Sequence, residues 1–399
     1  MGELSVSSFP NGVMLIAAHR PTAATQALGL WVRVGARDEP PGLAGATHWL
    51  EHLMFRGNTP GAAANGGEPR GRALARLGGQ VNGGVGREAL ALQGWVPRES
   101  APALAGLLIG MLREPALTVQ ALDAERVRIS REGGAGTRSL AWALPGHALA
   151  NPIPGDARAL AKIAPEALRQ WWREHCTGGR IAAIAAGAWD AAALCAACVE
   201  LRELPAQAGP EPDATSSAWL RLVPASGDFA AAPVGTAGWL LPGPVLGEAG
   251  EWAFRLAERW VALALGAEPF GAPVVGAPVV SRLEFTRGAS LWSLSLALAD
   301  TVPAEAARTL EDALGRLVAE GPDPVALEAA RCGLLAQVVL EADDPPGALA
   351  RLGEEWIVSG AAREREALRS GITAVSADAA QAALREALAR ALPFGWPRP

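Results

Sequence analysis

One short motif, His48-x-x-Glu51-His52, constrains this chain more than any other stretch. In a helix, His48 and His52 lie one turn apart on the same face, and Glu51 lies beside them. Leu50 and Leu53 then point the other way, toward a core. The spacing therefore predicts an amphipathic helix that brings two imidazoles and a carboxylate together.

Two imidazoles beside a carboxylate are the donors of a zinc site. A catalytic zinc ion takes three protein ligands and leaves a fourth position for water, so His48 and His52 need one more ligand from elsewhere. Glu51 is then better placed as a general base, as in the zinc hydrolases that carry this motif. The alternative interpretation is two helical histidines on a solvated face beside a chance glutamate.

The sequence around the motif resembles the pitrilysin and insulinase family of zinc peptidases, the inverzincins that include the mitochondrial processing peptidases. The resemblance rests on the segments 9–13, 34–42, 48–52, 77–82, 146–149 and 154–155. It covers the first half of the chain well and the second half thinly. It implies an α+β fold of two homologous domains related by duplication, which form half of a clamshell. The expected divisions are 1–205 with the metal site, a linker at 206–217, and 218–399 without a metal site.

Local patterns agree with a sheet in the first half. Residues 4–18 alternate around Asn11-Gly12, which predicts a β-hairpin, and residues 27–34, 80–85 and 89–95 have the pattern of further strands. The segment 205–217 is rich in Pro, Ala and acidic residues without periodicity, which is typical of a linker.

The composition excludes some classes of partner. The net charge is −6 and no basic cluster occurs, which argues against nucleic acid or an anionic membrane as the main partner. No signal segment or long apolar stretch is recognised, so the expected location is the cytoplasm. Cys195 and Cys198 form a C-x-x-C in an Ala-rich run, where buried small residues are expected rather than a redox site.

The third zinc ligand is assigned through the resemblance. The stretch 125–132 is similar to the family's pattern of two glutamates seven residues apart on one helical face. The match makes Glu132 the third ligand of one Zn²⁺ per chain, and Glu125 a carboxylate that orients the site. The alternative is that both glutamates are solvated charges that pair with Arg128 and Arg131.

The resemblance also points to residues that bind substrate. Asn82 matches a family position that contacts substrate, on an edge strand to which an extended peptide can add. This chain has Gly83-Gly84-Val85 where family members usually have Ala-x-Thr, and Asn82 is alternatively a turn residue.

In the family, the second domain contributes an arginine and a tyrosine to the closed site. Arg287 matches the arginine, but Trp292 stands where the tyrosine belongs, and the chain has no tyrosine at all. Bacterial members of this size often pair a metal-bearing chain with a metal-free one that supplies both groups. We therefore expect a heterodimer with a related subunit, with a homodimer as the alternative. Alternatively, Trp292 replaces the phenol as a packing and hydrogen-bonding group.

The resemblance implies a hydrolase, a zinc-dependent metalloendopeptidase that cleaves peptides or unfolded segments. Glu51 would take the proton from the water on the metal. Two alternatives remain, a dedicated processing protease for one peptide precursor and an inactive scaffold subunit of the same fold.

Overall fold

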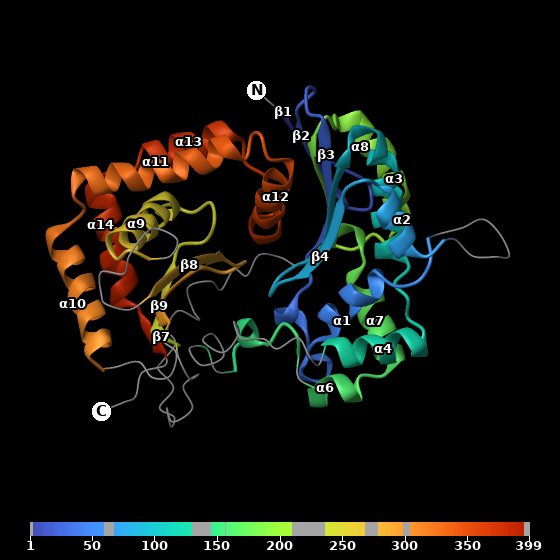
Figure 1. Ribbon diagram of the computed structural model, residues 1–399, viewed down its shortest axis with the longest axis horizontal. Helices are drawn as coiled ribbons and strands as arrows, with labels where there is room; N and C mark the ends of the chain where they lie inside the picture. Colours follow the sequence, from blue (N-terminus) through green and yellow to red (C-terminus); the bar gives the residue numbers. More distant parts are fainter. Residues whose placement is uncertain are drawn as a thin grey trace. The chain divides into compact units, whose positions relative to one another are not determined.

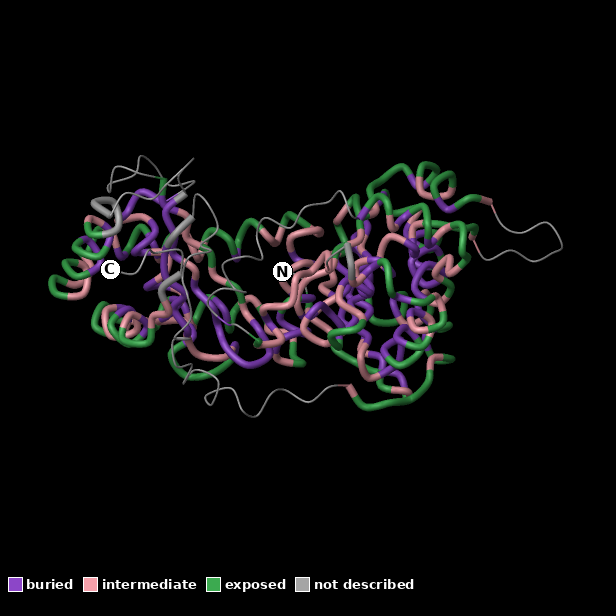
Figure 2. The backbone as a smooth tube through the Cα atoms, turned by 90° about the horizontal axis from the view of Figure 1, so that it is seen from below, coloured by how far each residue is buried: buried purple, intermediate pink, exposed green. Residues whose placement is uncertain are grey.

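The computed structural model describes residues 3–59, 68–129, 144, 146–155, 157–209, 236–267, 278–297 and 304–394. The chain divides into two compact units, each with its own sheet, helices and buried core (Figures 1 and 2). Unit 1 takes its described residues from 1–137, 147–211 and 341–362, and unit 2 takes its own from 138–146, 212–340 and 363–399.

A six-stranded sheet forms the centre of unit 1, in the order β1-β2-β6-β3-β5-β4. The strands are β1 (Glu3–Ser8), β2 (Met14–His19), β3 (Thr25–Val32), β4 (Gln80–Val85), β5 (Leu90–Pro97) and β6 (Ile181–Gly187). The pair β2 and β6 is parallel, and the other neighbours are antiparallel. The hairpin predicted at Asn11-Gly12 is confirmed, since Ser8 pairs with Met14 across a turn in which Gly12 has a φ of 96°.

Most helices of unit 1 cover one face of this sheet. They are α1 (Ala46–Met54), α2 (Arg70–Arg76), α3 (Ala101–Arg113), α4 (Val119–Ile129), α6 (Ala157–Lys162), α7 (Pro165–His175) and α8 (Ala191–Ala197). Alternate residues of the central strand β3, such as Leu28, Leu30 and Val32, point into the core that these helices share.

The opposite face of the sheet is covered by α12 (Pro345–Ser359), which comes from late in the sequence. Trp31 of β3 packs there with Leu349, Leu352 and Trp356 in a separate apolar cluster. A β-carbon on Gly353 would overlap the Trp31 ring, so helix and sheet approach closely. The expected domain 218–399 includes this helix, whereas its packing places it in unit 1, because both faces of β3 are apolar and need cover.

Unit 2 repeats part of this topology. Its sheet has the order β10-β7-β9-β8. Its strands are β7 (Thr236–Gly243), β8 (Val279–Phe285), β9 (Ser290–Ala297) and β10 (Leu392–Phe394), and its helices are α9 (Glu251–Ala264), α10 (Ala304–Glu320), α11 (Pro324–Leu340), α13 (Arg365–Thr373) and α14 (Ala377–Ala389). In both units a strand leads to a helix, then to a hairpin, and later to a strand that returns beside the first: β3, α1, β4-β5 and β6 correspond to β7, α9, β8-β9 and β10. The predicted α+β fold is confirmed.

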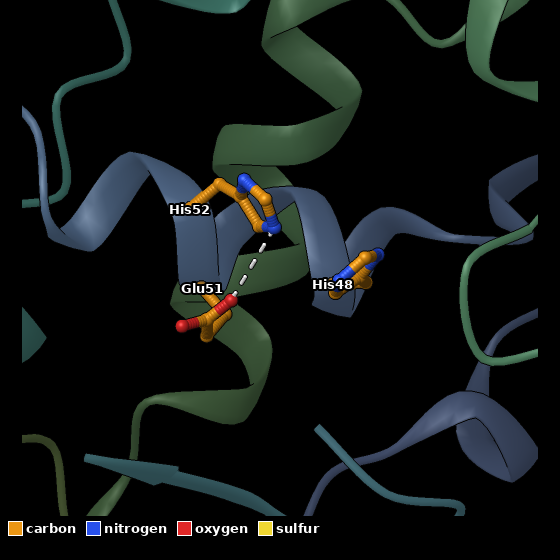
Figure 3. Close-up of side chains that lie close together, drawn as sticks. All are labelled: His48, Glu51 and His52. Carbon is orange, nitrogen blue, oxygen red and sulfur yellow. Dashed lines mark ion pairs between the residues drawn. The ribbon is translucent and has the colours of Figure 1, made fainter. Parts of the chain in front are cut away.

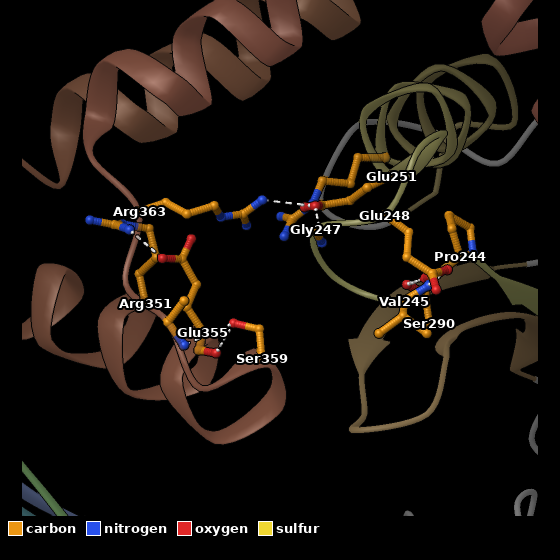
Figure 4. A network of polar contacts seen from close by, with 12 residues as sticks. Pro244, Val245, Gly247, Glu248, Glu251, Ser290, Arg351, Glu355, Ser359 and Arg363 are labelled. Carbon is orange, nitrogen blue, oxygen red and sulfur yellow. Dashed lines mark hydrogen bonds and ion pairs between the residues drawn. The ribbon is translucent and has the colours of Figure 1, made fainter. Parts of the chain in front are cut away.

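The two helices that occupy corresponding places, α1 and α9, also begin alike. Each follows a left-handed glycine, Gly45 with φ 92° and Gly250 with φ 91°. In unit 2, Glu251 accepts hydrogen bonds from the Gly247 amide at 2.7 Å and from Arg363 at 2.7 Å (Figure 4). The shared start supports the predicted duplication.

Among the described residues, no helix has both the length and the apolar character needed to span a bilayer. The four cysteines are free thiols, and burial raises the pKa of Cys198 to about 12. Such a thiol is not ionised near neutral pH. Cys198 is thus buried, as the sequence predicts, whereas Cys195 of the same motif is partly exposed.

Candidate metal centre

Helix α1 is held at its N-terminus by a buried carboxylate. Glu39, 4% exposed, accepts the amide N–H groups of Gly45 and Thr47, each at 2.7 Å. These amides belong to the first turn, which has no intrahelical acceptors. Burial raises the pKa of Glu39 to about 7, although the two amides oppose that rise. The sequence alone did not single out Glu39, which reaches the helix end from the preceding loop.

The structure brings His48, Glu51 and His52 together on one face of α1 (Figure 3). One donor atom from each side chain lies within 4.8 Å of the others, and the two imidazole rings meet edge to face with centroids 4.8 Å apart. Oε2 of Glu51 is 3.7 Å from Nε2 of His52. All three residues are partly exposed, with 11% of the His52 side chain and 12% of the Glu51 side chain accessible.

A second carboxylate orients one imidazole. Glu125 of α4, 1% exposed, accepts a hydrogen bond from Nδ1 of His52 at 2.9 Å, and its other oxygen pairs with Arg56. Burial acts to raise the pKa of Glu125, but the hydrogen bonds from His52 and Arg56 outweigh it and hold that pKa below its usual range. Because Nδ1 donates, Nε2 of His52 carries the lone pair and is the nitrogen that can bind a metal.

Strand β4 runs past Glu51. A β-carbon on Gly83 would overlap Oε1 of Glu51 and lie 2.7 Å from its Cδ atom. Asn82, the predicted substrate contact, is exposed on the same strand, and its side chain points to the opposite face because neighbouring residues of a strand alternate. The structure therefore brings the backbone of β4, but not the Asn82 side chain, to the cluster.

The predicted third ligand, Glu132, lies outside the described residues. Arg287 and Trp292 lie in unit 2, and both are buried. Trp292 is 0% exposed, its indole N–H donates to Oγ of Ser281 at 2.9 Å, and its ring packs edge to face on Phe254. Trp292 is therefore a core residue with a satisfied polar group, as the packing alternative predicts.

The C-terminal end of α1 is held by Arg70, which the sequence did not single out. Arg70, 1% exposed, donates to the carbonyl oxygens of Met54, Arg56, Gly110 and Glu114. These oxygens lie at or just beyond the C-terminal ends of α1 and α3, where helices leave carbonyls without intrahelical donors, although the Gly110 oxygen also accepts the amide of Glu114. An arginine early in a short helix carries no local signal of such a role.

The described donors fit a zinc ion. Zinc binds imidazole nitrogen and carboxylate oxygen, and both kinds converge here with one imidazole already oriented from behind by Glu125. Two metal-binding rings and an adjacent carboxylate are also features of sites for metal-assisted hydrolysis, which need one further protein ligand.

Comparison with known proteins finds a match to the family that the sequence resembles. Residues 14–145 match the family model described as Insulinase (Peptidase family M16). A protein of Streptomyces coelicolor named an uncharacterized zinc protease is 26% identical over 199 residues, 48% of this chain and 42% of that protein. The mitochondrial-processing peptidase subunit beta of Blastocladiella emersonii is 27% identical over 202 residues, 48% of this chain and 43% of that protein.

Coenzyme PQQ synthesis protein F of Pseudomonas aeruginosa is 36% identical over 182 residues, 43% of this chain and 23% of that protein. The matching segment thus spans less than half the length of each of these relatives.

Solved structures extend the likeness to the whole chain at the level of fold. A protease from Helicobacter pylori superimposes with a TM-score of 0.80 at 12% identity, covering 97% of both chains. An M16-like peptidase from Alicyclobacillus acidocaldarius gives 0.76 at 16% identity, covering 98% of this chain and 97% of the other. The family model over residues 14–145 and the relatives named zinc proteases thus confirm the resemblance to the insulinase family of peptidases, family M16, and the solved structures show the same fold over the whole chain.

Proposed function

We propose that this protein is a zinc metalloendopeptidase that hydrolyses peptide bonds in peptides or unfolded segments. The observation that carries the proposal is the convergence of His48, Glu51 and His52, with Glu125 hydrogen-bonded behind His52. His48, His52 and Glu132 would hold the ion. The match of residues 14–145 to a peptidase family model and the relatives named zinc proteases support the same activity.

The residues at the site have separate roles in the proposed reaction. A bound zinc ion would supply a Lewis acid that polarises the scissile carbonyl and acidifies a water molecule. Glu51 takes the proton of the attacking water and delivers it to the leaving amine. Glu125 keeps the Nε2 lone pair of His52 directed at the site. The partial exposure of the cluster gives an extended peptide access to it.

We further propose that substrate adds along β4, with Asn82 of that strand as a contact. The other predicted contact, Arg287, is buried in unit 2 and stays a prediction. In the described order of the first sheet β4 is the last strand, so its outer edge has no neighbouring strand there, and Asn82 is exposed. A strand edge offers main-chain hydrogen bonds to an extended peptide whatever its sequence.

A related metal-free subunit is the proposed partner. The chain has no tyrosine, and the tryptophan at the expected place is buried with its N–H already bonded to Ser281. A partner that supplies an arginine and a tyrosine would complete the site, and one relative is itself named as a subunit. The proposed location of this pair is the cytoplasm.

Dedicated processing of one peptide precursor is the second candidate function. The relative from Pseudomonas aeruginosa, 36% identical over the matched segment, is named for the synthesis of a coenzyme. A dedicated enzyme would cleave one precursor and leave unrelated peptides intact, so a panel of unrelated fluorogenic peptides separates the two candidates.

The deciding test measures metal content and peptide cleavage for the wild type and Glu51→Gln, each alone and with a co-expressed metal-free paralogue. We expect about one zinc ion per chain in both proteins, and cleavage that falls about 100-fold or more in Glu51→Gln, because the proton acceptor is lost. Cleavage by the lone wild type would remove the partner requirement. Absence of zinc, or no cleavage by the wild type even with the paralogue, would leave an inactive scaffold as the better interpretation. Full activity in Glu51→Gln would show that Glu51 is not the proton acceptor.

A further inference from the structure

Each oxygen of the Glu125 carboxylate has its own partner. Oε2 accepts the hydrogen bond from Nδ1 of His52 at 2.9 Å. Oε1 receives two N–H groups of one guanidinium, Nε and Nη2 of Arg56. The carboxylate is therefore held from two directions, by the imidazole on one oxygen and by Arg56 on the other.

The guanidinium is carried by a fixed piece of backbone. Arg56 lies just beyond the end of α1, where its N–H donates to the Leu53 carbonyl at 3.2 Å. Its own carbonyl accepts a hydrogen bond from Nη1 of Arg70 at 2.7 Å. A continuous series of contacts thus runs from Arg70 through Arg56 and Glu125 to His52.

The two members of the Arg56–Glu125 pair differ in exposure. The Arg56 side chain is 49% exposed, whereas the Glu125 side chain is 1% exposed. Two exposed charges contribute little to each other, but a buried carboxylate is costly to keep in place when it loses a partner. Without Arg56, the Glu125 carboxylate would turn toward solvent or another donor, and its Oε2 would leave Nδ1 of His52.

We propose that Arg56 is a positioning residue of the metal centre: it fixes the Glu125 carboxylate, which in turn fixes the direction and the tautomer of the His52 imidazole. The proposal rests on the proposed function in taking His52 as a zinc ligand. With the proton held on Nδ1, Nε2 of His52 keeps the lone pair that a metal needs. Arg56 acts through Glu125 and not on the reacting atoms.

A role as a simple charge predicts the opposite effect on metal binding. A guanidinium near the cluster repels a divalent cation, so on electrostatic grounds alone its removal would strengthen zinc binding. Loss of a positioning contact would weaken zinc binding, because contacts behind a ligand raise its affinity for metal. The sign of the change in zinc affinity therefore separates the two roles.

The first measurement needs no metal. The chain has five histidines, so the imidazole nitrogens of the isotope-labelled, metal-free protein give a simple NMR spectrum. In the wild type, His52 should be the Nδ1–H tautomer, and in Arg56→Met it should become a mixture of tautomers because Nδ1 loses its acceptor. His175 is the internal control for folding, since its Nδ1 donates to the Trp171 carbonyl at 2.8 Å and should give the same signal in both proteins.

The second measurement is zinc affinity, by competition with a chromogenic chelator. We expect Arg56→Met to bind zinc about 10-fold more weakly than the wild type, at the lower end of the range for contacts behind a ligand. Arg56→Lys keeps a cation that can donate to Oε1, so it should restore both the zinc affinity and the His52 tautomer. The matched control is Arg76→Met, which removes an exposed arginine from its pair with Glu68 and should change neither measurement.

A double variant tests the route of the effect. In a Glu125→Ala background, Arg56→Met should cause no further loss of zinc affinity, because the carboxylate through which Arg56 acts is gone. An equal loss in that background would overturn the proposal, as would an unchanged His52 tautomer or stronger zinc binding in Arg56→Met alone. If the wild type binds no zinc and cleaves no peptide, the proposed function fails, while the tautomer measurement still decides whether Arg56 positions His52.

Discussion

At the scale of single residues, the candidate centre depends on buried groups outside the motif as well as on the motif itself. Glu39 and Glu125 are nearly inaccessible carboxylates that hold, respectively, the helix start and one imidazole. Each carboxylate forms a hydrogen bond with a group at least six residues away in the sequence.

Glu39 makes stability depend on pH. Its pKa in the folded chain is about 7 against 4.5 for an ordinary glutamate, so the folded state holds a proton between these values that the unfolded state has lost. The stabilising contribution is complete below pH 4.5 and is lost as the pH rises through 7, a change of about 3 kcal/mol in the free energy of unfolding. Glu39→Gln should remove this part of the pH dependence.

Urea unfolding of both proteins at pH 5, 6, 7 and 8 measures the difference directly. Glu99→Gln, a change at an exposed glutamate, is the matched control and should keep the wild-type slope. If Glu39→Gln and the wild type lose the same stability over this pH range, Glu39 does not titrate there.

At the scale of elements, helix α1 is fixed at both ends by residues outside it. The Glu39 carboxylate accepts amides of the first turn, and the Arg70 guanidinium donates to Met54 and Arg56 at the other end. The same guanidinium reaches Gly110 and Glu114, which joins α1 to α3. A helix of nine residues is marginal by itself, so these contacts and the core packing keep the histidines in place.

Replacing the arginine tests this element. Arg70→Met keeps most of the apolar stem but removes the guanidinium donor from the carbonyl oxygens of Met54, Arg56 and Glu114, while the Gly110 oxygen keeps the amide of Glu114. We expect a loss of about 3 kcal/mol or more in the free energy of unfolding, together with weaker zinc binding. Arg72→Met, at an exposed position of the same helix, should change either quantity little. Comparable losses in the two variants would show that the carbonyl contacts contribute nothing specific.

At the scale of the whole molecule, the course of the chain does not follow the division into halves. Unit 1 is completed by residues 341–362, whose helix α12 covers the second face of its sheet. Arg33 stacks on Trp356 with 4.4 Å between guanidinium carbon and ring centre, and it also donates to the Trp356 carbonyl. The first sheet is therefore not fully covered until the chain has been made almost to its end.

This arrangement predicts the behaviour of a fragment. Residues 1–209 alone would expose Trp31 and its apolar neighbours, at a cost of several kcal/mol for the side chains that α12 buries. We expect that fragment to bind a hydrophobic dye and to melt at a lower temperature than the same fragment joined to residues 341–362 by a flexible linker. A linked helix carrying Leu349→Asp and Trp356→Asp should not restore stability. A fragment that is stable and dye-free without the helix would contradict the prediction.

What the sequence by itself determined is local in origin. The spacing of His48, Glu51 and His52 follows from the helical period, and the Asn11-Gly12 hairpin follows from turn chemistry, so both were predictable without coordinates. The family could be recognised for the same reason, because its motifs are short and contiguous. Only the tertiary structure decided which distant residues serve the motif: Arg70 reaches α3 across some forty residues, and α12 reaches β3 across more than three hundred. Burial, close packing and the hydrogen bonding of backbone groups at helix ends are properties of the assembled fold. No periodicity in the sequence indicates them.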